Sequence, residues 1–226
     1  MSKALVLLSG GIDSTTCLAI AREQCDVVCG LSFIYGQRHA KEVMAAKEIC
    51  RVFEVPHVVL GIPNVFGGSD SSVLVAGAAV PHLSYEEMKQ YRIPPTYVPQ
   101  RNLIFLSLAS ALAIVQDFRY VYLGIHQEDS EAAYPDCTPE FFRAARTAVS
   151  LGSGEKVLLK APLLMFSKVS VIRRATSLSV PLHLTWSCYE GGELHCGQCP
   201  TCISRIEAFK WAGIEDPTVY KEGCSL

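Results

Sequence analysis

The sequence predicts an α/β protein built on a doubly wound parallel sheet, with a small cysteine-rich unit after it. Short continuous apolar runs alternate with segments of helical periodicity as far as residue 178, which is typical of buried parallel strands joined by helices. Four of the ten cysteines then crowd between Cys188 and Cys202. We therefore expect an α/β domain over residues 1–185 and a separate C-terminal unit over residues 186–226.

The composition fits one domain with a large core. About half of the 226 residues are hydrophobic, and a chain of this length buries much of its surface without needing disulfides. The net charge of −2 implies no broad basic surface, which argues against stable nucleic-acid binding. No apolar run is long enough to span a membrane, and no signal peptide is evident. The cysteines are not spread as in a secreted disulfide scaffold, so we expect a cytoplasmic protein.

The first part of the chain is expected to alternate strictly between strands and helices. Apolar runs predict strands, and apolar residues recurring every three or four positions predict helices. The first helix should be capped by Asp13 or Ser14. We expect strands at 3–9, 26–35 and 56–62 and helices at 14–24 and 40–53.

Residues 63–98 interrupt this alternation. They are rich in glycine, serine and proline, as in a lid or binding loop, and Ser84 to Glu87 form a capping-box pattern. A helix at 103–115 is apolar on most faces and is expected to be buried. The remaining expected elements are a strand at 120–125, a helix starting at Thr138–Pro139, a strand at 155–163 and a helix at 167–178.

The segment SGGIDS, from Ser9 to Ser14, joins the first strand to the first helix. Gly10 and Gly11 allow a tight turn and a close approach of the backbone to a ligand. The hydroxyls add donors, and the helix start adds unpaired N–H groups and partial positive charge. These features predict a phosphate cradle at the edge where open α/β sheets bind ligands. The segment matches neither a Walker A loop nor the GxGxxG dinucleotide fingerprint.

The C-terminal cysteines follow the spacing C-x7-C-x2-C-x2-C, at Cys188, Cys196, Cys199 and Cys202. Four thiolates suit tetrahedral Zn²⁺ in a closed site, with bonds of about 2.3 Å. An iron–sulfur cluster stays an alternative, as does replacement of Cys196 by the neighbouring His195. Because a closed site does not catalyse, we expect the metal to stabilise the fold.

SGGIDS resembles the pyrophosphate loop of the N-type ATP pyrophosphatases, the PP-loop superfamily. This resemblance implies an adenine nucleotide α-hydrolase-like, Rossmann-like fold and activation of a carbonyl oxygen by adenylation. It implies ATP on the loop, with Asp13 acting through Mg²⁺, because a carboxylate repels phosphate directly, or serving as a helix cap. The implied ATP-binding residues are Leu8, Ser9, Gly10, Gly11, Ile12, Asp13, Ser14, Thr15, Thr16, Cys17 and Leu18.

Further motifs narrow the resemblance to one family. In order they are FIYGQRH (33–39), YVPQRNLIFL (97–106), YPDCTPEF (134–141), PLLMFSK (162–168) and the cysteine tail with AGIEDPT (212–218). Together they are similar to the 7-cyano-7-deazaguanine (preQ0) synthases of queuosine and archaeosine biosynthesis. The resemblance covers nearly the whole chain and is weakest over residues 63–91.

The resemblance implies a ligase that forms a carbon–nitrogen bond. ATP adenylates 7-carboxy-7-deazaguanine, ammonia displaces AMP to give an amide, and a second activation dehydrates the amide to a nitrile. No glutaminase domain fits in 226 residues, so free ammonia is the expected donor. The resemblance also implies a homodimer, for which the sequence offers no independent support.

The resemblance assigns catalytic roles to Asp13, Lys168 and Arg101. Lys168 starts a helix and is expected to hold the phosphates, although a solvated surface lysine would give the same pattern. Arg101 and Asn102 follow a stiff proline segment and are expected to position substrate or phosphate, or to cap the next helix.

The expected substrate-binding residues follow strands at the ligand edge of the sheet. Asp129 or Asp136 is expected to accept hydrogen bonds from the guanine-like N1–H and amino group. Cys137 is interpreted as a packing residue because the mechanism needs no nucleophile. The full substrate set is Gln37, Arg38, Asn102, Asp129, Tyr134 and Asp136.

Two positions depart from the family pattern, Ile34 where a polar residue is usual and Gln100 where a small one is usual. The spacing before YPDC also differs by one residue. A relative that stops at the amide, or couples the carboxylate to another amine such as one on a protein, therefore stays open. More distant alternatives are a PP-loop tRNA-modifying enzyme and a zinc module without enzymatic activity.

Overall fold

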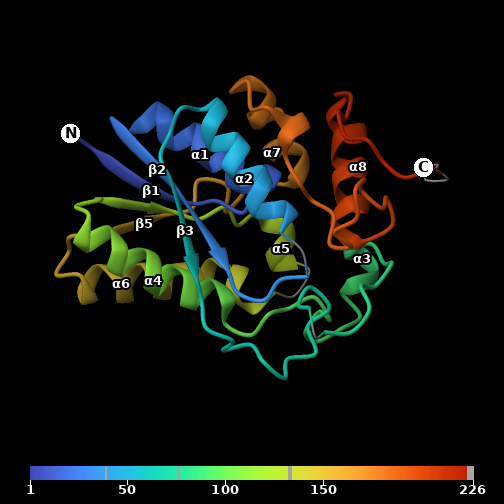
Figure 1. Ribbon diagram of the computed structural model, residues 1–226, viewed down its shortest axis with the longest axis horizontal. Coiled ribbons are helices and arrows are strands. Elements are labelled where there is room, and N and C mark those ends of the chain that lie inside the picture. Colours follow the sequence, from blue (N-terminus) through green and yellow to red (C-terminus); the bar gives the residue numbers. More distant parts are fainter. Residues whose placement is uncertain (39, 76, 132–133, 223–226) are drawn as a thin grey trace.

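The computed structural model describes residues 1–38, 40–75, 77–131 and 134–222. Its centre is a five-stranded parallel sheet in the order β3-β2-β1-β4-β5 (Figure 1). The order reverses beside β1, so the sheet is doubly wound as predicted, and SGGIDS lies at the switch point where such sheets bind ligands. The strands are β1 (Lys3–Leu7), β2 (Val27–Ile34), β3 (His57–Gly61), β4 (Tyr120–Tyr122) and β5 (Leu158–Lys160).

Helices cover both faces of the sheet. One face carries α1 (Ile12–Gln24), α2 (Lys41–Val52) and α7 (Lys168–Ser177), and the other carries α4 (Arg101–Val115) and α6 (Pro139–Gly152) (Figure 1). Successive side chains of a strand point to opposite faces. Leu5 and Leu7 of β1 therefore pack toward α4 and α6, while Val6 and Leu8 pack toward α1, α2 and α7. Burial on both faces explains the continuous apolar runs of the strands.

Two predicted helix starts are confirmed. Ser84 caps α3 (Tyr85–Met88) in a complete capping box with Glu87. Thr138 accepts a hydrogen bond from the N–H of Phe141, and Pro139 begins α6.

The predicted cap of the first helix is wrong. α1 begins two residues earlier than expected, at Ile12, and its N-cap is Gly11, which has no side chain to bond. Ser14 instead donates its hydroxyl to the Gly11 carbonyl at 3.1 Å, and Asp13 binds Lys168. Both side chains therefore stabilise the SGGIDS loop and do not cap the N-terminus of α1.

The prediction that the helix after the insertion is buried on most faces is also wrong. Leu103, Leu108, Ile114 and Val115 of α4 are exposed, and Val115 keeps 82% of its surface accessible. The buried residues of α4 are Asn102, Leu106, Ala109 and Ala113. The sheet covers only one side of α4. The apolar composition of the helix does not show which of its sides are covered, so the prediction overstated its burial.

The insertion over residues 63–98 contains α3 and, among its described residues, no other helix or strand. Arg38 joins it to the end of β2, donating hydrogen bonds to the carbonyls of Ser72 at 3.1 Å and Ala78 at 2.7 Å. The short elements elsewhere are α5 (Gln127–Glu131) and the 3-10 turns Pro135–Cys137 and Leu182–Leu184. In the described ranges, no helix is both long and apolar enough to cross a membrane.

The C-terminal segment docks on the sheet domain through α8 (Pro200–Ala212), which packs against α7. Arg205 of α8 is fully buried, pairs with Asp216 at 3.0 Å and donates a hydrogen bond to Thr185 at 2.8 Å. The N–H of Trp186 donates to the carbonyl of Gly10 at 2.9 Å. The cysteine-rich segment is thus attached directly to the SGGIDS loop.

Candidate active site

Gly10 shapes the loop because no other residue fits its position. Its φ is +88°, in the left-handed region that disfavours side chains. A Cβ placed there would lie 2.4 Å from the carbonyl oxygen of Glu42 and 2.8 Å from the nitrogen of Ala46. The loop therefore lies against the first turn of α2.

Hydroxyl groups hold the rest of the loop. Ser14 Oγ accepts from the Ser9 N–H at 3.2 Å and lies 3.1 Å from Ser9 Oγ, which in turn accepts from the Gly11 N–H at 3.3 Å. Gly124, just past β4, comes so near that a Cβ on it would lie 2.9 Å from the Ser14 nitrogen. The loop is thus preformed around the start of α1, where unpaired N–H groups favour an anion.

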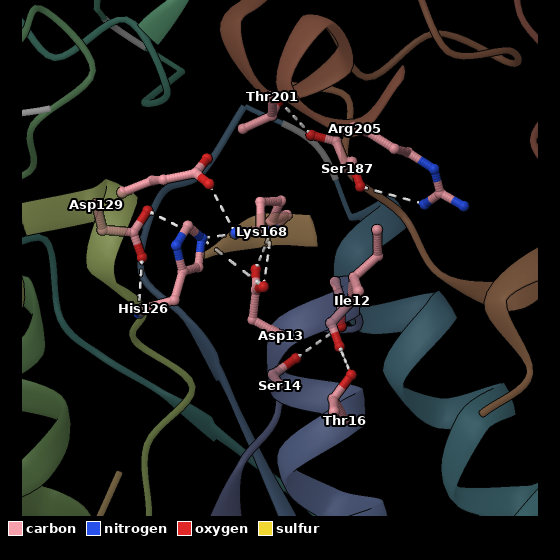
Figure 2. A network of polar contacts seen from close by, with 12 residues as sticks. Ile12, Asp13, Ser14, Thr16, His126, Asp129, Lys168, Ser187, Thr201 and Arg205 are labelled. Atoms are coloured by element: carbon pink, nitrogen blue, oxygen red, sulfur yellow. Dashed lines mark hydrogen bonds and ion pairs between the residues drawn. The ribbon is translucent and has the colours of Figure 1, made fainter. Parts of the chain in front are cut away.

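A charged network crosses this loop (Figure 2). Lys168 Nζ lies 2.8 and 2.6 Å from the two carboxylate oxygens of Asp13, so it is not a solvated surface lysine. His126 Nε2 lies 3.5 Å from Lys168 Nζ and 3.5 Å from Asp129 Oδ1. Burial opposes ionisation of Asp13, but Lys168 and His126 outweigh it, so the pKa of Asp13 lies below its usual range. Asp13 is therefore ionised at neutral pH.

The network lies in a cavity of about 220 Å³ at the carboxyl edge of the sheet. The expected site residues that line it are Leu8, Ser9, Gly11, Ile12, Asp13, Ser14, Gln37, Arg101, Asn102, Asp129, Tyr134 and Lys168. The other expected site residues do not line the cavity. Gly10 packs on α2, Arg38 binds the insertion, and Asp136 is hydrogen-bonded to Asn102. The remaining ones are buried in α1, namely Thr15, Thr16, Cys17 and Leu18.

The start of α4 forms the opposite wall. Arg101 donates a hydrogen bond to the Tyr35 hydroxyl at 3.3 Å. The N–H of Asn102 donates to Asp136 Oδ2 at 3.0 Å, and its side chain donates to the Asp136 carbonyl at 2.9 Å. Asp136 is thus occupied in holding the helix start. Burial raises the pKa of the Cys137 thiol well above its usual range, which agrees with a packing role.

Several residues that line the cavity were not predicted from the sequence. Glu42 lies in the first turn of α2, and burial raises its pKa to about 7 although Arg101 opposes the shift. His126 is 1% exposed, and its Nδ1 has no hydrogen-bond partner among the described residues. His126 directly follows a predicted strand, so its position at the ligand edge was a usable signal. Tyr85 and Tyr189 also line the cavity, but they come from the insertion and the cysteine tail, where no local pattern marks them.

The four cysteines of the C-terminal segment meet in a second centre. Their sulfur atoms all lie within 4.8 Å of one another and are buried. Tetrahedral bonds of 2.3 Å to one zinc ion place sulfurs about 3.8 Å apart, so the spacing fits one metal ion better than a cluster of several. The N–H groups of Cys199 and Gln198 point at Cys196 Sγ from 3.2 and 3.4 Å, which favours a thiolate. His195 accepts from the Ser187 N–H at 3.1 Å and is not part of this group.

Solved structures share the overall arrangement. One is described as a predicted subunit of tRNA methyltransferase from Methanocaldococcus jannaschii, with a TM-score of 0.53 and 14% identity over 96% of this chain and 91% of that one. The other is the U34-tRNA thiolase NcsA from Methanococcus maripaludis with its 4Fe–4S cluster, with a TM-score of 0.51 and 15% identity over 93% and 65%. At these identities the likeness to both proteins shows a shared fold.

The chain belongs to the family described as Queuosine biosynthesis protein QueC, whose model matches residues 3–213. A curated relative, the 7-cyano-7-deazaguanine synthase of Acetivibrio thermocellus, is 42% identical over 98% of this chain and 99% of its own length. The family resemblance inferred from the ordered motifs is thereby confirmed.

Proposed function

We propose that this protein is an ATP-dependent ligase that converts 7-carboxy-7-deazaguanine and ammonia to 7-cyano-7-deazaguanine. The observation that carries the proposal is one cavity in which the SGGIDS loop, Lys168 and Arg101 meet, in a chain similar along its length to a synthase of that name. Its acidic and aromatic walls suit a flat, hydrogen-bonding base, and its loop suits phosphate.

The first step activates the substrate carboxylate. A carboxylate oxygen attacks the α-phosphorus of ATP, the bond to the β-phosphate oxygen breaks, and pyrophosphate leaves with the electron pair. The N–H groups at the start of α1 and the Lys168 ammonium stabilise the negative charge on the departing phosphates. Asp13 would hold Mg²⁺, which would supply further neutralisation of the phosphate charge. Arg101, which lines the same cavity, is proposed to hold the substrate carboxylate or the phosphates.

The second step forms the carbon–nitrogen bond. The nitrogen lone pair of ammonia attacks the activated carbonyl carbon, AMP leaves, and the proton lost from nitrogen passes to solvent. The amide oxygen is then adenylated in the same way. When AMP departs a second time it carries that oxygen away, and loss of the two remaining N–H protons leaves the nitrile.

Asp129 is the proposed acceptor for the N1–H and amino group of the base, since Asp136 is occupied by Asn102. Gln37, Asn102 and Tyr134 are proposed to line the substrate. The four cysteines are proposed to hold one structural Zn²⁺. We also propose a cytoplasmic homodimer, with residues 1–185 carrying the chemistry and residues 186–226 forming the zinc unit. The net charge of −2 does not favour the alternative tRNA-modifying activity.

ATP–pyrophosphate exchange that depends on 7-carboxy-7-deazaguanine tests the adenylation step without ammonia. Wild-type protein should catalyse the exchange, and Lys168→Met should slow it about 100-fold to 1,000-fold, as when one transition-state donor is lost. Lys156→Met, which removes an exposed lysine outside the cavity, is the matched control and should leave the rate unchanged. Folded wild-type protein that shows no exchange would contradict the proposal.

A further inference from the structure

A second cavity, of about 330 Å³, lies beside the active site between α3, α5, α7 and α8. We call it the acidic vestibule. Its lining includes four glutamates but only two lysines, and the exposed Trp211 also lines it. The charged lining residues are Glu86, Glu128, Glu131, Glu207, Lys89 and Lys168.

The negative charge of the vestibule is not neutralised by its lysines. Lys168 is paired with Asp13 at 2.6 Å, and Lys89 is paired with Glu86 at 2.5 Å. The other three glutamates form no ion pair with any described residue. Glu128 accepts the Lys168 backbone N–H at 2.7 Å, and Glu131 accepts from the side-chain amide of Gln127 at 2.7 Å. The vestibule therefore attracts small cations, and an aromatic face adds to that attraction.

A buried hydroxyl marks the boundary between the two cavities. Tyr85, Lys168 and Ser204 line both of them and so form the wall that they share. Ser204 is 7% exposed, and no described group forms a hydrogen bond with its Oγ. Burying a hydroxyl without a partner costs stability. Its place in this wall indicates that a small polar ligand passes or rests there.

We infer that the acidic vestibule binds ammonium and supplies ammonia to the active site past Ser204. The inference rests on the proposed function, which consumes ammonia. Ammonium is a compact cation with four N–H donors, which matches a lining of carboxylates. Ammonium has no lone pair with which to attack the activated carbonyl carbon, so the species that reacts is neutral ammonia, and the proton that it loses goes to water in the vestibule. The same acidic lining repels ATP and pyrophosphate.

The test compares a charged nucleophile with a neutral one. The double variant Glu131→Gln/Glu207→Gln removes two of the carboxylates without a cationic partner, and AMP release is measured with ammonium and with hydroxylamine, which is neutral at neutral pH. Losing two carboxylate attractions should raise the KM for ammonium about tenfold. The KM values for hydroxylamine, ATP and 7-carboxy-7-deazaguanine should not change. Glu215→Gln, an exposed glutamate outside the vestibule, is the matched control.

The outcomes separate this inference from the proposed function. If wild-type protein lacks ATP–pyrophosphate exchange, the proposed function itself is wrong. If exchange is present but the double variant keeps the wild-type KM for ammonium, the vestibule does not collect ammonium. An equal rise in KM for ammonium and hydroxylamine would also overturn the inference, because it would indicate a change of shape rather than of charge. A primary amine on a peptide that reacts better than ammonium would identify a different occupant.

Discussion

Glu42 makes the stability of this protein depend on pH in a direction opposite to that of an ordinary paired carboxylate. It lies against the SGGIDS loop in the wall of the active-site cavity. Burial raises its pKa from 4.5 to about 7, and the nearby Arg101 offsets part of this shift. Between these two pH values the folded protein holds a proton that the unfolded chain has released.

The sign and size of the effect follow from proton linkage. When the folded state binds more protons, the free energy of unfolding falls as the pH rises. The contribution of Glu42 is therefore fully present below pH 4.5 and is lost as the pH rises through about 7. The difference of about 2.5 pKa units, at 1.36 kcal/mol each, amounts to about 3 kcal/mol.

Glu42→Gln removes this titration. For a chain of this size 1 kcal/mol shifts the melting temperature by about 2–4 °C. The melting temperature of the variant minus that of the wild type should therefore be about 6–12 °C higher at pH 9 than at pH 5. Thermal unfolding at both pH values measures it, with Glu54→Gln, an exposed glutamate, as control. A difference that is the same at both pH values would refute the assignment.

Three further substitutions test the loop, the metal centre and the buried ion pair. Gly10→Ala puts a Cβ 2.4 Å from the Glu42 carbonyl, so we expect ATP–pyrophosphate exchange to fall at least about tenfold; wild-type exchange would contradict the loop geometry. Cys199→Ser should lose bound zinc and lower the melting temperature, as read by elemental analysis and thermal unfolding; a full zinc content would exclude Cys199 as a ligand. Asp216→Asn leaves Arg205 buried without its ionic partner and should cost about 3–5 kcal/mol in urea denaturation; a loss below about 1 kcal/mol would show that Arg205 finds other support.

The parts of the fold that the sequence predicts best are those set by local pattern. The central strands are buried on both faces, so their apolar runs stand out, and the loop at the switch point carries its glycines and hydroxyls within six residues. The cysteine spacing likewise predicted four thiols that meet in one buried centre. In each case the residues that determine the structure lie together in one short segment of the sequence.

The misses share a different cause, which is packing between distant segments. The exposure of Val115 depends on how many elements cover α4. Asp13 does not cap α1 and instead bonds to Lys168, 155 residues away. Glu42 enters the site because Gly10 draws α2 against the loop. Tyr189 reaches the cavity from the cysteine-rich segment. Contacts between distant segments cannot be predicted from the periodicity of a single segment.

Mass spectrometry of the reaction product shows directly whether this protein makes the nitrile. Purified protein is incubated with 7-carboxy-7-deazaguanine, ATP, Mg²⁺ and ammonium, and the deazaguanine product is identified by mass. We expect the nitrile, 7-cyano-7-deazaguanine, with AMP and pyrophosphate released. An amide that accumulates, or a conjugate formed only when a protein is added, would contradict the final step while keeping the adenylation. The absence of any ATP-dependent product would contradict the proposed ligase activity.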